Sequence, residues 1–194
     1  MAANATPTGK LTAGGIGGFL LAGAMVLLFV SEAAGAGGGA GGAGILGLIA
    51  FLLVVGGGIC HALGYFGMGN SLPGILAIVF GIAPVLAIVL PIVGGLTMLR
   101  ISLLILFGSG GLLGILGGIS LMGKESAGGL GKAGGIVSLI GGGCMAFTAV
   151  LTLIPDLAIS LGGVASIISM VGLFGSAAGF ALAGVTMLGQ RNAA

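Results

Sequence analysis

The sequence predicts an all-α fold, a polytopic transmembrane helical bundle of about six spans arranged as three tandem helical hairpins. Charge is the first observation: only 4% of the 194 residues are Asp, Glu, Lys or Arg, whereas a soluble globular domain carries roughly 25%. Apolarity is the second, because 58% of the residues are hydrophobic and the mean hydropathy is +1.38. The apolar residues occur in runs of about 20, the length of a helix that crosses the hydrocarbon core. So few charges could not cover the surface of a soluble domain.

Six apolar stretches predict the spans. They cover roughly residues 13–30, 45–66, 72–93, 99–122, 134–154 and 164–188. The third and fourth have almost nothing polar between them, but together they are too long for one crossing. We therefore expect the chain to turn near Pro91, Gly94 and Gly95. After the fifth span, Pro155 and Asp156 predict a short interfacial segment that Asp156 caps.

The charged residues predict the orientation of these spans. With six spans both termini lie on one side, and that side collects four of the five basic residues, Lys10, Lys124, Lys132 and Arg191. Arg100, Glu32 and Asp156 fall on the other side. Cytoplasmic loops carry the excess of Lys and Arg. We therefore expect an integral, multi-pass membrane protein with both termini in the cytoplasm.

Short internal matches indicate a repeat. Residues 13–16 and 133–136 both read AGGI, and residues 107–109 and 174–176 both read FGS. We interpret the chain, residues 1–194, as one membrane domain built from hairpins at about 10–67, 72–123 and 132–190. Such glycine-rich hairpins resemble the proteolipid ring subunits of rotary ATPases. Those subunits carry an ion-binding carboxylate near mid-membrane, whereas Glu32, Glu125 and Asp156 lie at helix ends or in loops, so the family is not assigned.

Glycine makes up 46 of the residues and recurs with small-xxx-small spacing. That spacing puts small residues on one helix face, where two backbones can approach closely. The predicted packing positions are Gly14, Gly18, Gly110, Gly114, Gly118, Gly131, Gly135, Gly175 and Gly179.

A second set of residues could line a polar path. Ser102 and Ser109 lie seven residues apart on one face of the fourth span, and Ser169 and Ser176 repeat that placement in the sixth. Hydrogen bonding between helices is the alternative, and we favour it. His61 is the single imidazole; it is either a functional group within a span or a donor to a neighbouring helix.

The remaining chemistry is sparse. One lone histidine supplies no nucleophile, base and orienting residue together, so we expect no enzyme, no catalytic residue, no metal site and no cofactor. Cys60 and Cys144 lie at different expected depths and predict no disulfide. A net charge of +2 gives no basis for nucleic-acid binding.

Two functions fit this pattern. The first is a structural or accessory subunit of a membrane complex or homo-oligomer, whose partners are membrane lipid and other membrane subunits or a second copy of itself. It follows from the glycine-rich helix faces and the short loops. The alternative is a small-solute channel or transporter, indicated by the repeat, the serine faces and the prolines at 84 and 91 in the third span.

Overall fold

The computed structural model describes residues 7–36, 40–124 and 128–191, and within these ranges it contains helices and no strand. Five of the helices are long and apolar enough to cross a membrane. The helices are α1 (Pro7–Ala36), α2 (Ala40–Gly67), α3 (Ser71–Met122), α4 (Gly128–Leu153), α5 (Pro155–Leu161) and α6 (Gly163–Arg191). The prediction of an all-α membrane bundle is confirmed.

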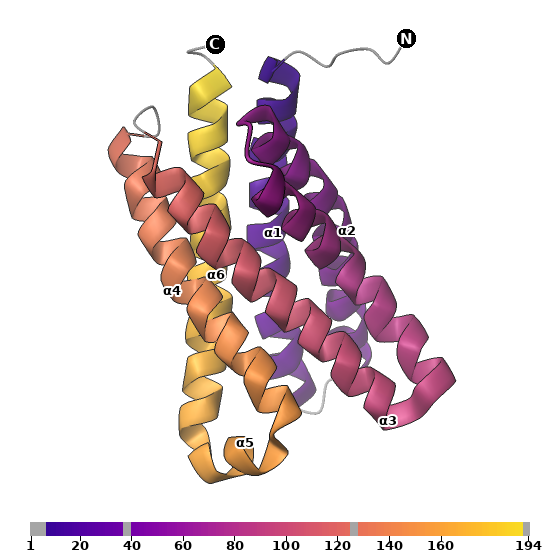
Figure 1. The fold of residues 1–194 in the computed structure, drawn as a ribbon. Coiled ribbons are helices and arrows are strands. Elements are labelled where there is room, and N and C mark those ends of the chain that lie inside the picture. Colours follow the sequence, from indigo (N-terminus) through magenta and orange to yellow (C-terminus); the bar gives the residue numbers. More distant parts are fainter. Residues whose placement is uncertain (1–6, 37–39, 125–127, 192–194) are drawn as a thin grey trace.

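Helix α3 provides two of the crossings. Its 52 residues would extend about 78 Å as a straight helix, far beyond the roughly 30 Å of the hydrocarbon core. Gly95 interrupts it with φ 61° and ψ −145°, a backbone conformation outside the helix. Figure 1 shows the first arm descending from the end near the termini and the second arm returning there. The chain therefore turns at one of the three residues predicted, and the five apolar helices provide six segments long enough to cross a membrane, which we call the crossing segments.

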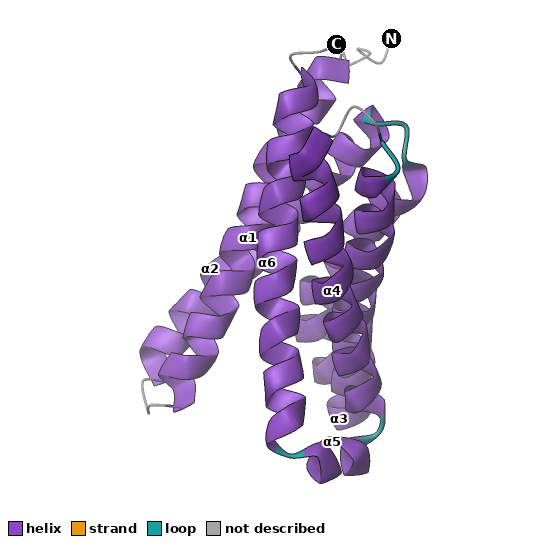
Figure 2. Ribbon diagram, turned by 90° about the vertical axis from the view of Figure 1, so that its left-hand side faces the viewer, coloured by secondary structure: helices purple, strands orange, loops and turns teal. Residues whose placement is uncertain are grey.

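The six crossing segments form a ring in chain order. Contacts join α1 to α2, α2 to α3, α3 to α4 and α4 to α6, and α6 closes the ring against α1. The two arms of α3 meet where Phe80 packs on Gly110. The Pro7 end of α1 and the Arg191 end of α6 lie at one end of the bundle, and α5 lies at the other (Figures 1 and 2).

The helices extend beyond most of the predicted spans. Alanine and glycine at the span ends continue the helix although they add little hydropathy; residues 33–36 and 40–44, for example, belong to α1 and α2. One prediction was wrong in detail. Asp156 does not cap α5, because the cap position is Ile154 and Pro155 occupies the start, which leaves Asp156 inside the first turn. Glu125 lies outside the described residues.

The helices diverge toward the end remote from the termini. In Figure 2, α1 and α2 lean away from α4 and α6 as they approach that end. Close packing is greatest in the half nearer the termini, where glycines of α1 face glycines of α2 and α6. The bundle is consequently tight at one end and open at the other.

Candidate functional site

A cavity of about 950 Å³ occupies the open half of the ring. All six crossing segments and α5 contribute to its wall, which includes Met25, Leu28, Gly44, Gly47, Leu48, Phe51, Val54, Phe80, Pro84, Ala87, Ile88, Leu103, Leu106, Phe107, Met145, Thr148, Leu151, Thr152, Ala158, Ala165, Ser166, Ser169, Met170 and Leu173. None of these described lining residues carries a charge. The volume is at the upper end of the range of small-molecule sites, which are typically about 300–1,000 Å³.

The polar side chains of the wall are gathered on α4 and α6. We call Thr148, Thr152, Ser166 and Ser169 the hydroxyl strip. The Thr148 Oγ1 lies 3.3 Å from the Ser169 Oγ, and this hydrogen bond joins the two helices. Thr148 also donates to the Cys144 carbonyl oxygen at 3.0 Å, and Thr152 donates to the Ala149 carbonyl oxygen at 2.7 Å.

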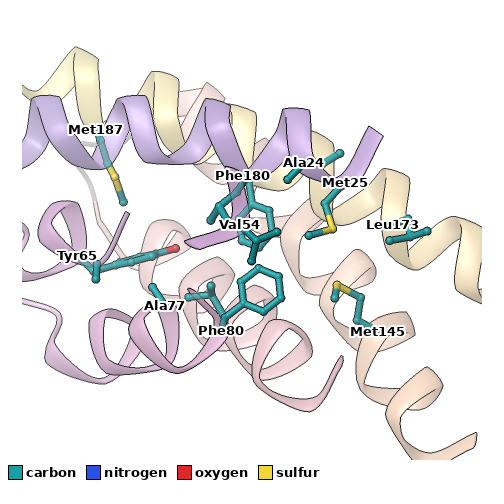
Figure 3. Packing of buried hydrophobic residues seen from close by; sticks show 14 of the residues in the cluster. Ala24, Met25, Val54, Tyr65, Ala77, Phe80, Met145, Leu173, Phe180 and Met187 are labelled. Carbon is teal, nitrogen blue, oxygen red and sulfur yellow. The ribbon is translucent and has the colours of Figure 1, made fainter. Parts of the chain in front are cut away.

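An aromatic layer closes the cavity toward the termini. It consists of His61, Tyr65, Phe80 and Phe180, all buried. Phe80 faces the cavity and stacks on Phe180, with ring centroids 6.1 Å apart. The His61 ring then packs edge-on against Phe180 at 5.7 Å and against Tyr65 at 4.9 Å. Figure 3 shows Phe80 and Phe180 near the centre of the core, with Tyr65 and Met187 on one side and Met145 and Leu173 on the other.

His61 connects the first two helices at this layer. Its Nδ1 lies 3.0 Å from the Gly14 carbonyl oxygen of α1. Because a carbonyl oxygen only accepts, Nδ1 carries the proton in this hydrogen bond. Nε2 is buried without a hydrogen-bond partner among the described residues. Gly17 makes this approach feasible, since a side chain there would collide with the backbone of His61.

The five residues predicted as a possible polar lining, His61, Ser102, Ser109, Ser169 and Ser176, do not lie together in the structure. Ser169 lines the cavity, whereas His61, Ser102, Ser109 and Ser176 are buried in the helix packing. Ser102 and Ser109 donate to carbonyl oxygens one turn earlier in their own helix, Met98 and Ile105, each at 2.5 Å. Ser176 donates across helices to the Met145 Sδ at 3.0 Å. Hydrogen bonding thus satisfies these three hydroxyls away from the cavity.

The predicted packing glycines contact other helices of the same chain. A Cβ on Gly114 would lie 2.8 Å from the Gly142 Cα, and one on Gly175 would lie 2.9 Å from the Gly141 Cα. The other approaches are those of Gly14 to Gly64, Gly18 to Phe180 and Gly184, Gly110 to Met145 and Phe80, Gly118 to Gly135, Gly135 to Met122 and Gly118, and Gly179 to Ser138. Gly131 is also buried. These faces therefore hold the six crossings together.

Three members of the hydroxyl strip, Thr148, Thr152 and Ser166, were not predicted from the sequence. Thr148 and Thr152 are four residues apart in α4, and Ser166 and Ser169 are three apart in α6. Those spacings place each pair on one helix face, so the pairs could have been found as faces. The two faces meet because of how α4 and α6 are rotated about their own axes, and the sequence does not reveal that rotation.

Other chemistry is sparse in the described part of the chain. It contains no group of three or more His, Cys, Asp or Glu side chains that could hold a metal ion. Cys60 and Cys144 are free and partly buried. Comparison with protein-family models, with curated proteins and with solved structures finds no match to this chain.

Proposed function

We propose that this chain is a non-catalytic membrane transporter that receives a small uncharged solute in its central cavity. One observation carries the proposal: the cavity is lined by all six crossing segments and closed at one end by the aromatic layer. A site lined by every span is typical of transporters, in which packed segments move around a fixed site. Because the aromatic layer is buried and blocks one end of the cavity, a transporter is favoured over a continuously open channel.

The distribution of charge supports an orientation. The ends of α1, α3, α4 and α6 that lie near the termini (Figure 1) carry or adjoin Lys10, Lys124, Lys132 and Arg191. Arg100 follows the turn of α3 at Gly95, and Asp156 belongs to α5 at the opposite end. By the positive-inside rule the termini are cytoplasmic. The cavity then faces the non-cytoplasmic side, and the aromatic layer separates it from the cytoplasm.

The glycine contacts weaken the alternative of an accessory subunit. Self-association was expected because glycine-rich faces favour contact between helices. In the structure the predicted glycines lie against helices of their own chain, so they do not require a partner. The accessory-subunit hypothesis would be supported instead by a defined set of companion subunits after gentle extraction and native mass spectrometry.

Solute flux tests the proposal directly. Proteoliposomes are assayed with uncharged solutes graded from glycerol to an alkyl glucoside. Gly44 lines the cavity with nothing within 4 Å of an added Cβ, so Gly44→Phe places a ring in the cavity without a backbone clash. Gly143 has equally open space but is not a lining residue, and Gly143→Phe is the matched control.

We expect at least one solute to cross faster than through protein-free vesicles, with Gly44→Phe reducing that flux and Gly143→Phe preserving it. If no solute in the series crosses faster, the transport proposal is rejected. Equal flux in the two variants would remove the cavity from the solute path.

A further inference from the structure

We propose that the cavity binds an uncharged amphiphile with an apolar body and a single hydrogen-bond donor, such as a hydroxyl group. This inference rests on the proposed function and specifies its solute. The donor is placed at the hydroxyl strip, and the body lies against the apolar wall that Met25, Phe80 and Met145 help to form.

The absence of charge in the wall defines the first property of the ligand. The described lining residues offer hydroxyl groups as their only polar side chains. Transferring an unpaired charge from water into such a wall is strongly unfavourable. A carboxylate, phosphate or ammonium group on the ligand would find no counter-charge there.

The hydrogen bonds of the strip define the second property. Thr148 uses its single proton on the Cys144 carbonyl oxygen, so Ser169 is the donor in the bond between Thr148 and Ser169. Thr152 likewise uses its proton on the Ala149 carbonyl oxygen. These three hydroxyls have therefore committed their protons and retain oxygen lone pairs. A group that pairs with these three hydroxyls must donate, whereas Ser166, the fourth member of the strip, has no hydrogen bond among the described residues and keeps its own proton.

The methionines of the wall define the third property. Met25, Met145 and Met170 come from three different helices. Methionine is unbranched and polarizable, and it adapts to irregular apolar shapes. The wall therefore suits an apolar body of variable outline, while the hydroxyl strip fixes the polar end.

A binding experiment uses the lack of tryptophan in the chain. Phe107→Trp puts one tryptophan in the cavity wall, where energy transfer reports a bound pyrene. The full chain is placed in phosphatidylcholine nanodiscs, because that lipid has no hydrogen-bond donor. The probes are 4-(1-pyrenyl)butanol, its methyl ether, and 1-pyrenebutyrate; they share a ring but differ in donor and charge.

We expect saturable binding of the alcohol, about three- to tenfold weaker binding of the ether because one hydrogen bond is lost, and still weaker binding of the carboxylate. Thr148→Val and Thr152→Val together with Ser169→Ala should reduce alcohol binding to the level of the ether and leave the ether unchanged. Ser160→Ala is the control, since that hydroxyl lies on α5 outside the cavity wall and bonds Leu157.

Each contrary result has a defined meaning. Equal binding of alcohol and ether, or strongest binding of the carboxylate, overturns the ligand class while the flux assay still judges transport. No saturable binding of any probe also overturns the inference. A lipid alcohol retained on the native protein in mass spectrometry would identify the bilayer as the ligand source, whereas binding only from the added aqueous probe would indicate a dissolved solute.

Discussion

Two adjacent glycines of α4 give the sharpest test of how the bundle is held together. A Cβ on Gly142 would lie 2.6 Å from the Gly111 carbonyl oxygen and 2.8 Å from the Ile115 nitrogen, whereas a Cβ on Gly143 would meet nothing within 4 Å. Both Gly111 and Ile115 contribute backbone atoms of α3, which cannot rotate away as a flexible side chain could. Gly142→Ala must therefore separate α4 from α3.

The difference in the free energy of unfolding between Gly142→Ala and Gly143→Ala measures the cost of the clash between α4 and α3. Each variant gains the same helix propensity of about 1 kcal/mol from replacing glycine with alanine, so that contribution cancels. Overpacking of a filled interior costs about 1–3 kcal/mol, and only Gly142→Ala incurs it. We expect Gly142→Ala to be less stable than Gly143→Ala by about that amount.

The assay is reversible unfolding in mixed detergent micelles with increasing SDS, followed by helical circular dichroism. The free energy of unfolding of each variant is compared with that of the unmodified chain. Gly143→Ala should match or exceed it. Equal free energies for the two variants would refute the close approach of α3 and α4, and with it the argument that glycine contacts are internal to the chain.

Three further predictions concern the turn, the orientation and the histidine. Gly95→Ala should lower the free energy of unfolding by about 1–3 kcal/mol, because φ 61° with ψ −145° is a conformation that only glycine adopts without strain; Gly108→Ala, which meets nothing within 4 Å, should not. In a cysteine-free background, Thr97→Cys and Gly189→Cys should react with an impermeant maleimide from opposite faces of sealed vesicles, and reaction from the same face would exclude a turn at Gly95. The nitrogen-15 spectrum of the single imidazole should show a proton on Nδ1, as its contact with the Gly14 oxygen requires. An Nδ1 without a proton would contradict that hydrogen bond.

Much of the fold could be predicted because a membrane restricts the chain strongly. In lipid each backbone polar group must be satisfied within its own helix, so long apolar stretches had to become spans. Length then required a turn within residues 72–122, and Gly95 was among the three residues expected to make it. The Pro7 end of α1 and the Arg191 end of α6 lie at the same end of the bundle (Figure 1) because the number of crossing segments is even.

The candidate site could be predicted only in part. Ser102 and Ser109 had the spacing of a polar face, but each hydroxyl bonds a carbonyl oxygen of its own helix. A serine or threonine can always satisfy itself in this way, so spacing does not reveal which hydroxyls reach a cavity. Ser169 reaches it because α6 presents that face to Thr148 of α4.

The sequence alone determined that this chain is helical, apolar and multi-pass, because hydropathy and helix length follow from the order of residues. Only the tertiary structure decided that the glycine faces meet within one chain, that the ring encloses a cavity, and that the hydroxyl strip faces into it. These features depend on the rotation of each helix about its own axis. That rotation is set by backbone contacts between glycines far apart in the sequence, such as Gly114 and Gly142. A local sequence pattern cannot predict such contacts.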